Sequence, residues 1–334
     1  MTSRHRVIII GAGLIGQKRG ESIKKIGSDE IVGVCDVNLD RARDLAKLWT
    51  ATAFSDYSSA LRKTKADIAV VATTHKTLPV ISYDALNQGL HVLCEKPLGR
   101  NATEVAPLVR LAKRRKLVYK CGFNHRYHPA ILQAKHMAGK NKIGPLMYVR
   151  ARYGHGGRPG YDKEWRADSD IAGGGELLDQ GIHIIDLARW FLGDFTKVMG
   201  MVQTAFWDMK PLEDNGFALL QTKQGQTAFL HASWTQWKNI FSFEIFGRNG
   251  ALTIDGLGKS YGVETLTWAR RKPESGPPDI KTFEFPEEDQ SWIAEWRDFL
   301  NSIKTNQPPL GSGADGLAAL TIIDQIYAQT FRTS

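Results

Sequence analysis

The sequence predicts an α/β protein with a doubly wound parallel sheet in its first part and an antiparallel sheet in its second part. Three observations predict this fold class. A strand leads through a glycine-rich turn into a helix, strands and helices then alternate up to about residue 94, and apolar residues later recur with a period of two. At 334 residues, of which 42% are hydrophobic and 24% charged, the chain is long enough for two domains.

The first expected element is a strand at residues 6–10, which a glycine fingerprint and a helix to about Ile26 follow. The G-x-G-x-x-G pattern allows a tight turn, close approach of a pyrophosphate and close packing of helix on strand. A second strand, residues 31–35, ends about 20 residues past the last glycine at an acid, where a ribose is usually bound. The sequence therefore predicts a dinucleotide site with Gly11, Gly13, Leu14, Ile15, Gly16 and Asp36.

Asp36 also indicates which dinucleotide is bound. A carboxylate there accepts hydrogen bonds from a ribose 2′-hydroxyl and repels a 2′-phosphate, which favours NAD over NADP. Arg41 and Arg43 are close enough in sequence to leave NADP possible, although both are expected on the solvated face of a helix at residues 39–49. We expect NAD as the cofactor.

The alternation continues with strands at residues 68–71 and 91–94 and a helix at 78–88 between them. Ligands of doubly wound sheets lie beyond the carboxyl ends of the strands. Two segments lie there, Thr73-Thr74-His75 and Glu95-Lys96-Pro97. Lys96 can therefore donate to a substrate oxygen at the cofactor crevice. The alternative is a surface lysine before a proline turn, and position alone does not separate the two.

Three glycines, Gly173 to Gly175, precede a mostly apolar segment that carries Asp179, His183 and Asp186. If the segment is an α-helix, at about 100° per residue these side chains lie within roughly 60° of one another and form a polar stripe. A histidine four residues from an aspartate is a general-base arrangement, because the carboxylate can orient the imidazole and stabilise its protonated form. The alternative is a core helix with a buried, hydrogen-bonded histidine.

The later part of the chain carries the signals of an antiparallel sheet. Phe241, Phe243 and Ile245 alternate with polar neighbours, and residues 222–226 and 248–250 are typical of hairpin turns. The other expected elements are a helix at 130–137, a strand at 147–153, and helices around residues 292–299 and 317–331.

Three motifs occur in series over essentially the full length: the glycine fingerprint, Glu95-Lys96-Pro97 and the segment from Gly173 to Asp186. Together they resemble the Gfo/Idh/MocA oxidoreductase family. The resemblance implies a Rossmann domain at residues 1–122, an α/β domain with an open, mostly antiparallel sheet at 123–312, and a C-terminal helix at about 313–334 that packs back on the first domain. It also implies hydride transfer between NAD(P) and a secondary alcohol or ketone carbon of a sugar, a cyclitol or a nucleotide-activated sugar.

The resemblance further implies residue roles. Lys96 and His183 would be the catalytic pair, Asp179 would assist them, and Asp36 would bind the adenosine ribose. The loop after the strand at 68–71 departs from the family pattern T-P-x-x-x-H, because Thr74 replaces the proline. The expected cofactor contacts outside the fingerprint are Asp36, Thr73, Thr74, His75, Glu95, Lys96 and Asn124.

The segment from Cys121 to Pro129 resembles the family's linker, so Asn124 and Arg126 are expected to face the active-site cleft. His125 and His128 are expected to be structural or solvated. The expected substrate contacts are Lys96, Asn124, Arg158, Tyr161, Trp165, Arg166, Asp179 and His183.

Four of these substrate contacts, from Arg158 to Arg166, lie in an irregular, glycine-rich insert that starts at His155. Its flexible backbone, cations and aromatic faces could bind the diphosphate and base of a nucleotide sugar. The alternative is an ordinary loop that becomes ordered in an oligomer. A free sugar or a cyclitol is as well supported as a nucleotide sugar.

Composition excludes several other classes of protein. The formal charge is +9, but the densest basic cluster, Lys113 to Lys116, ends a probable helix, where cations suit the helix dipole, and no nucleic-acid motif accompanies it. No apolar run approaches the length of a membrane span. Three cysteines without metal-ligand spacing indicate buried thiols in a reducing compartment, so we expect a cytoplasmic protein without a metal.

Two interpretations of function follow. The first is a dehydrogenase that forms a homodimer or homotetramer through its C-terminal sheet, where aromatic stripes are expected to pack a core or a subunit contact. The second is a non-catalytic, dinucleotide-binding sugar sensor of the same fold. The presence of Lys96, Asp179 and His183 together argues against the sensor, because a pure binder has no need of acid–base groups.

Overall fold

The computed structural model describes residues 4–330 and divides into two compact units. Residues 4–124 and 292–318 form the first unit, and residues 125–291 and 319–330 form the second. We expected residues 292–312 in the second domain, whereas the structure assigns them to the first unit. The last helix, α10 (Gly313–Thr330), contributes to both units. Residues 331–334 of the expected C-terminal helix lie outside the described residues.

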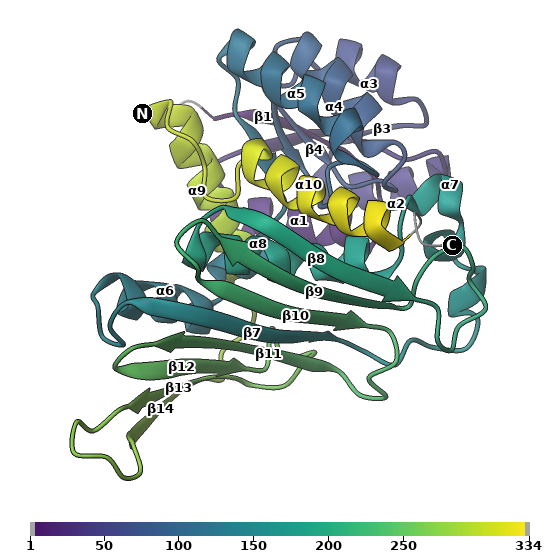
Figure 1. The fold of residues 1–334 in the computed structure, drawn as a ribbon. Helices are drawn as coiled ribbons and strands as arrows, with labels where there is room; N and C mark the ends of the chain where they lie inside the picture. The colour runs from purple at the N-terminus through teal and green to yellow at the C-terminus, as the bar shows by residue number, and fades with distance from the viewer. Residues whose placement is uncertain (1–3, 331–334) are drawn as a thin grey trace. The chain divides into compact units, whose positions relative to one another are not determined.

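The first unit is built on a sheet of six parallel strands in the order β3-β2-β1-β4-β5-β6 (Figure 1). This is the doubly wound order, and it confirms the predicted parallel sheet. The strands are β1 (Arg6–Ile10), β2 (Glu30–Cys35), β3 (Thr52–Phe54), β4 (Ile68–Val71), β5 (His91–Cys94) and β6 (Tyr119–Cys121). The helices between them are α1 (Leu14–Ile26), α2 (Leu39–Trp49), α3 (Tyr57–Thr64), α4 (Leu78–Asn87) and α5 (Ala102–Arg115).

Helix α9 (Ser291–Thr305) joins this unit through a buried network of charged side chains. Arg19 of α1 donates to Glu95 at 2.7 Å from Nε and to Glu295 of α9, and all three side chains are buried. Lys120 lies 3.5 Å from the same Glu295. Burial raises the pKa of the Glu95 carboxyl, and the Arg19 guanidinium opposes that shift. The interior thus holds two cations, Arg19 and Lys120, and two carboxylates, Glu95 and Glu295. This pairing compensates the charges, because an unpaired buried charge would strongly destabilise the fold.

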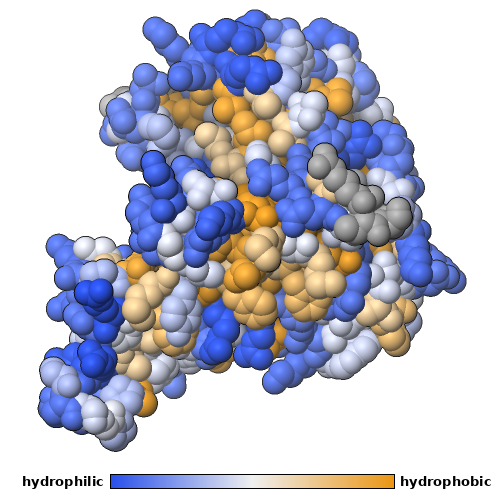
Figure 2. Space-filling view, viewed as in Figure 1, coloured by the Kyte–Doolittle hydropathy of each residue, from blue (hydrophilic) through white to orange (hydrophobic). Residues whose placement is uncertain are grey.

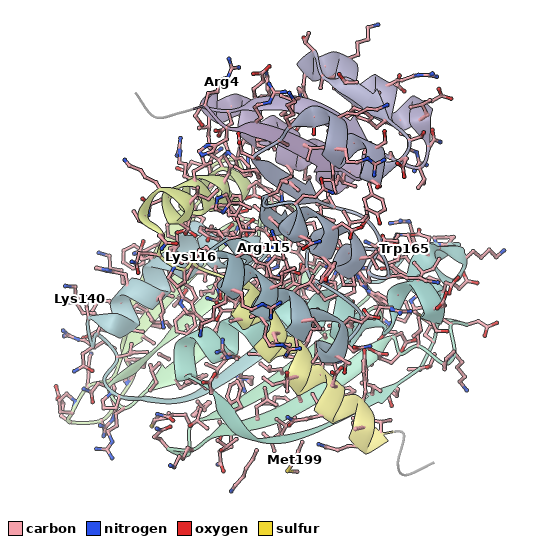
Figure 3. All side chains as sticks on the ribbon, turned by 90° about the horizontal axis from the view of Figure 1, so that it is seen from above. Arg4, Arg115, Lys116, Lys140, Trp165 and Met199 are labelled. Atoms are coloured by element: carbon pink, nitrogen blue, oxygen red, sulfur yellow. The ribbon has the colours of Figure 1, made fainter. Side chains whose placement is uncertain are left out.

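The basic cluster at the end of α5 lies where the sequence predicted it. Lys113, Arg114 and Arg115 occupy the last turn, and Lys116 caps the helix in the left-handed conformation. Figure 3 labels Arg115 and Lys116 at this end of the helix. The cations face the negative end of the helix dipole.

The second unit is built on an eight-stranded sheet in the order β14-β13-β12-β11-β7-β10-β9-β8. All neighbours are antiparallel except β7 and β10, which confirms a mostly antiparallel sheet (Figure 1). The strands are β7 (Leu146–Gly154), β8 (Phe195–Gln203), β9 (Asn215–Thr222), β10 (Thr227–Ser233), β11 (Ile240–Gly247), β12 (Gly250–Asp255), β13 (Glu264–Arg270) and β14 (Asp279–Phe285).

Two helices, α6 (Pro129–Gly139) and α8 (Ile182–Leu192), pack on the inner face of this sheet. Phe241, Phe243 and Ile245 of β11 are buried on that face, as their alternation predicted. The outer face carries exposed apolar side chains from neighbouring strands, and Figure 2 shows hydrophobic surface over β8 to β10. Met199 extends from β8 there and is 60% exposed (Figure 3).

No helix within residues 4–330 is long and apolar enough to cross a membrane. Cys35, Cys94 and Cys121 are buried thiols of the first unit.

Candidate functional site

The glycine fingerprint forms a tight turn between β1 and α1. Gly11 has a φ of 106°, and a Cβ there would collide with the carbonyl oxygen of Ala72; a Cβ at Gly16 would collide with the carbonyl oxygen of Gly11. Nothing lies within 4 Å of a Cβ placed on Gly13. Gly13 caps α1 without a side-chain hydrogen bond, and the first turn carries no acidic residue. The turn therefore offers open backbone and a helix N-terminus, which suit a pyrophosphate.

Asp36 lies directly over this turn at the end of β2. One carboxylate oxygen accepts from the backbone N–H of Ala12 at 2.8 Å, and the other accepts from the N–H of Asn38 at 2.9 Å. Two apolar side chains near it are strongly exposed, Leu14 at 69% and Val37 at 95%. These groups fit NAD, because a fixed carboxylate suits a ribose diol and exposed apolar side chains suit an adenine. The sequence reasoning missed Val37, whose only signal is its place after Asp36.

The loops after β4 and β5 carry the other expected cofactor residues. Thr73 and Thr74 are half-buried, and the Thr77 hydroxyl lies 2.9 Å from the Thr73 hydroxyl and 3.0 Å from the carbonyl of Thr74. His75 is buried. Glu95 is buried on Arg19, and Lys96 beside it is half-buried. The Arg19–Glu95 contact thus anchors the residue that precedes Lys96.

The segment with Asp179 and His183 is helical but not one regular α-helix. Leu177–Gly181 forms a π-helical turn, and the α-helix α8 begins at Ile182. A π turn carries extra residues per turn, so the even stripe expected for Asp179, His183 and Asp186 does not hold; such turns are frequent at functional sites. The start of the turn is held from outside the segment: the Glu213 carboxylate accepts from the N–H groups of Gly175 and Leu177, each at 3.0 Å.

Glu213 is itself buried, and burial raises the pKa of its carboxyl to about 7. It also accepts from the Tyr327 hydroxyl at 2.7 Å. A distant acid thus fixes the start of the helix that carries Asp179 and His183.

Asp179 is buried and tied to the insert. Arg166 donates from Nε to its carboxylate at 2.9 Å, and the guanidinium lies 4.5 Å from the ring centre of Trp165. Arg158 is mostly exposed and pairs with Glu164 at 2.5 Å. The structure therefore brings Trp165 and Arg166 to Asp179.

Tyr161 of the insert packs its ring in a hydrophobic cluster with Met209, Leu212 and Trp234, and its ring centre lies 4.8 Å from that of Trp234. Burial, and after it the negative charge of Asp179, raises the pKa of the Tyr161 hydroxyl. The residue therefore combines a packed ring with an electrostatic interaction with Asp179.

His183 is buried on α8, and its ring stacks on that of His125, with centres 3.7 Å apart and planes at 16°. Asp186, one turn further along, accepts two hydrogen bonds from Arg126 at 2.7 and 2.6 Å. Asn124, also buried, starts the short 3-10 turn η1 (Asn124–Tyr127) that carries these residues. The sequence predicted His125 to be structural or solvated; the structure shows it buried and packed against His183, which excludes the solvated alternative.

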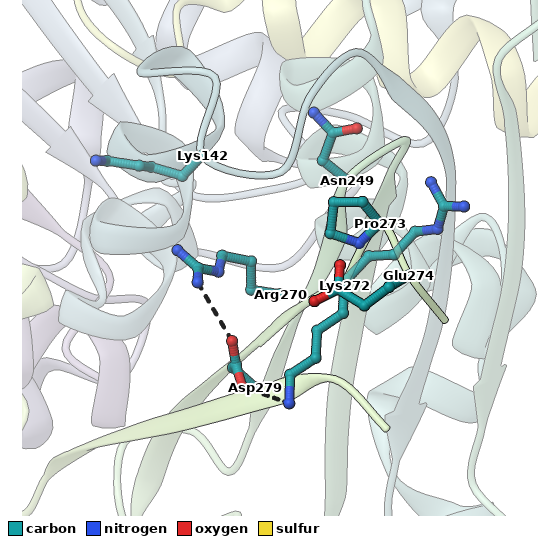
Figure 4. A pocket seen from close by; sticks show the side chains of 8 residues that line it. Lys142, Asn249, Arg270, Lys272, Pro273, Glu274 and Asp279 are labelled. Atoms are coloured by element: carbon teal, nitrogen blue, oxygen red, sulfur yellow. Dashed lines mark hydrogen bonds and ion pairs between the residues drawn. The ribbon is translucent and has the colours of Figure 1, made fainter. Parts of the chain in front are cut away.

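A hollow of about 530 Å³ lies elsewhere, beside the β13–β14 hairpin (Figure 4). Asp279 accepts there from Arg270 at 3.3 Å and lies 3.1 Å from Lys272. None of the expected site residues lines this hollow, and its cations share a carboxylate at the surface, where ion pairs contribute little. We therefore do not assign the function to it.

Comparison with known proteins covers both units. Residues 5–123 match the sequence model of an oxidoreductase family with an NAD-binding Rossmann fold, and residues 131–253 match the GFO/IDH/MocA C-terminal domain. D-glucoside 3-dehydrogenase of Escherichia coli (strain K12) is 31% identical over 247 residues, which cover 69% of this chain and 70% of that protein. Myo-inositol 2-dehydrogenase of Thermotoga maritima is 24% identical over 332 residues, 95% of this chain and 93% of that protein.

A solved structure, levoglucosan dehydrogenase in complex with NADH and levoglucosan, superposes with a TM-score of 0.89. The two chains are 22% identical, and the match covers 99% of this chain and 98% of that one. At this identity the match shows a shared fold.

Proposed function

Because the chain belongs to the GFO/IDH/MocA family of oxidoreductases, we propose that it transfers a hydride between NAD and a secondary alcohol carbon of an unactivated sugar or cyclitol. The observation that carries the proposal is a buried imidazole, His183, in a chain that also has an open glycine turn under Asp36. One chain thus supplies a cofactor cradle and an acid–base group. A sensor needs only the cradle, and the relatives named above are dehydrogenases.

The chain's own residues then have separate roles. NAD, when bound, supplies the hydride acceptor. His183 accepts the proton of the substrate hydroxyl as the hydride leaves the carbon that bears this hydroxyl. The Lys96 ammonium stabilises the negative charge that develops on the hydroxyl oxygen. Asp179, held by Arg166, accepts a hydrogen bond from a neighbouring hydroxyl of the substrate. Asn124 and Trp165 contribute further contacts to cofactor and substrate.

The charges of the insert favour an unactivated substrate over a nucleotide sugar. Between residues 155 and 170 the chain has three cations against four carboxylates: Arg158, Lys163 and Arg166 against Asp162, Glu164, Asp168 and Asp170. Arg158 and Arg166 already pair with Glu164 and Asp179. A diphosphate would have to compete for them, whereas a neutral polyol can share hydrogen bonds with an intact ion pair. Relatives named for inositol and glucoside support the same choice.

We further propose that the protein assembles with itself through the outer face of the eight-stranded sheet and acts in the cytoplasm. Exposed apolar side chains on neighbouring strands support the assembly. The three buried thiols support a reducing compartment.

The function is tested by following nicotinamide absorbance with the purified protein, NAD⁺ or NADP⁺, and a panel of inositols, glucosides, anhydrosugars and UDP-sugars. We expect turnover of an unactivated member with NAD⁺. Lys96→Ala and His183→Ala should each lower kcat by roughly 10²- to 10⁴-fold, the range for a lost acid–base group, with NADH affinity nearly unchanged. Lys113→Ala, which removes an exposed lysine of α5, is the matched control. Turnover of UDP-sugars alone would contradict the substrate class, and full activity of both variants would contradict the mechanism.

A further inference from the structure

We propose that His125 is a positioning residue that fixes the plane of the His183 imidazole, and that the Arg126–Asp186 ion pair holds His125 in place. The inference rests on the proposed role of His183 as the group that accepts the substrate proton. Both histidines and both members of the ion pair belong to the second unit.

The His125 and His183 rings are in direct contact. Their centres lie 3.7 Å apart and their planes are inclined by 16°, so they meet face to face, and both side chains are buried. A ring packed flat against another cannot turn about its Cβ–Cγ bond without a collision. The His183 imidazole therefore has a fixed plane as long as His125 stays in place.

Other aromatic rings surround the His125 ring. Tyr153 lies edge-to-face with it at a centre-to-centre distance of 5.3 Å and an angle of 63°, and Phe241 at 6.0 Å and 62°. His128, on the same segment, meets it at 5.7 Å and 73°. The Nδ1 atom of His128 is in turn 2.5 Å from the carboxylate of Glu264. Three aromatic rings, inclined by 62° to 73°, thus pack against the ring that lies flat on His183.

An ion pair attaches the segment that carries His125 to α8. Arg126 follows His125 directly, and Asp186 follows His183 by one helical turn, so the two contacts lie side by side. Arg126 and Asp186 form a bidentate, buried ion pair, which is a strong and directional contact. The Arg126 guanidinium also lies 5.3 Å from the ring centre of Trp190 on the same helix. The ion pair therefore fixes the segment that carries His125 against the helix that carries His183.

The consequence for catalysis is geometric. An imidazole nitrogen accepts a proton through a lone pair in the plane of its ring, so a tilt of the plane misaligns the lone pair with the substrate hydroxyl. A misalignment of about 1 Å can cost 10²-fold in rate while substrate binding is nearly unaffected. The flat ring of His125 should matter here more than its ability to carry a proton.

The test compares His125→Phe with His125→Ala, because phenylalanine keeps a flat ring and removes the second imidazole. We expect His125→Ala to lower kcat by about 10- to 100-fold with KM changed less than about threefold, and His125→Phe to retain at least about a third of the wild-type kcat. Arg126→Lys keeps the charge but loses the bidentate geometry, so it should lower kcat in the same way. His136→Ala, which removes an exposed histidine of α6, is the matched control and should be silent.

NADH affinity and the thermal transition of each variant show whether the fold is intact. Loss of activity in folded His125→Phe to the level of His125→Ala would overturn the proposal, and so would unchanged kcat in both His125→Ala and Arg126→Lys. An undiminished kcat in His183→Ala would instead contradict the proposed role of His183 in the reaction, and the positioning role would fall with it. If His125→Ala does not fold, the loss of kcat in Arg126→Lys tests the proposal in its place.

Discussion

At the scale of single residues, the Asp36 carboxylate is held in one place at the glycine turn. Its two oxygens accept hydrogen bonds from the backbone N–H groups of Ala12 and Asn38. Arg43 pairs with Asp40 on the exposed side of α2, and Arg41 is also exposed, as the sequence predicted. If the adenosine ribose binds at this turn, as we propose, Asp36 places a negative charge beside it.

Asp36→Ala is expected to shift the cofactor preference toward NADP. The variant loses a charged acceptor for the ribose diol, worth about 1.5–3 kcal/mol, and removes repulsion of a 2′-phosphate. The ratio of kcat/KM with NADP⁺ to kcat/KM with NAD⁺ should therefore rise at least about tenfold. The control is Asp40→Ala, which removes an exposed acid in the first turn of α2, four residues after Asp36. An unchanged ratio in Asp36→Ala would show that this carboxylate does not select the cofactor.

Motif spacing in the sequence was sufficient to predict which residues lie close together when they belong to one short segment. Asp36 and the glycines of the turn lie within one strand–turn–helix–strand unit, so their proximity could be predicted. The contacts of His125 and Arg126 could not, because Arg126 and Asp186 are 60 positions apart and meet only in the folded second unit. The catalytic roles of Lys96, Asp179 and His183 stay predictions.

At the scale of elements, the helix that carries His183 depends on a residue from outside its own segment. The spacing of the polar residues predicted a regular α-helix with about 3.6 residues per turn. This spacing did not indicate the π turn at Leu177–Gly181. The Glu213 carboxylate that holds the N–H groups at its start lies 38 positions from Gly175. By contrast, the bounds of α2, β4 and β5 were predicted correctly, because each is set by its own apolar pattern and turn residues.

Glu213 should make stability depend on pH in a defined direction. The pKa of its carboxyl is about 7 in the folded protein against 4.5 for the ordinary group, so between these values the folded state keeps a proton that the unfolded chain has released. This contribution to the free energy of unfolding is fully present below about pH 4.5 and is lost as the pH rises through about 7. The wild type should therefore lose stability relative to Glu213→Gln over this range, at up to about 1.4 kcal/mol per pH unit.

The measurement is urea unfolding of the wild type and of Glu213→Gln at several pH values from about 5 to about 8. In this range the carboxyl is ionised in the unfolded chain but still partly protonated in the folded protein. Glu274→Gln, which alters an exposed acid of the β13–β14 loop, should run parallel to the wild type. A stability difference between wild type and Glu213→Gln that is constant across the range would show that Glu213 does not titrate in the folded protein.

At the scale of the whole molecule, the strand order of the eight-stranded sheet could not be predicted from the alternation of apolar and polar residues. Alternating residues and hairpin turns predicted antiparallel neighbours, but β7 and β10 are parallel and far apart in the chain. Both strands pack their inner faces against the same helix, α8, which brings them together although they are far apart in the chain. The outer face follows from the same register, which aligns Met199 of β8, Leu219 of β9 and Phe229 of β10 in one row.

This outer face should be the contact between subunits. We expect the wild type to be a dimer or a tetramer in light-scattering measurements at micromolar concentration, and the double variant Met199→Glu, Met201→Glu to be a monomer, because charges on an apolar contact must be desolvated. Val80→Glu places the same charge on an exposed apolar position of α4 and should leave the mass unchanged. A monomeric wild type, or a double variant of unchanged mass, would contradict the proposed contact.

The division of the chain between its two units also bears on how the protein is made. Residues 4–124 bring Arg19 and Lys120 into the first unit, but the carboxylates of Glu295 and Asp298 that pair with them lie on α9, beyond the whole of the second unit's sheet. As the chain leaves the ribosome, the nascent first unit has two cations for its interior and only Glu95 to balance them. N-terminal domains usually fold first during synthesis, whereas this N-terminal unit lacks α9 and the Glu295 carboxylate until residues 291–305 have been added. Its cofactor-binding unit can reach its native charge balance only when almost the entire chain has been translated.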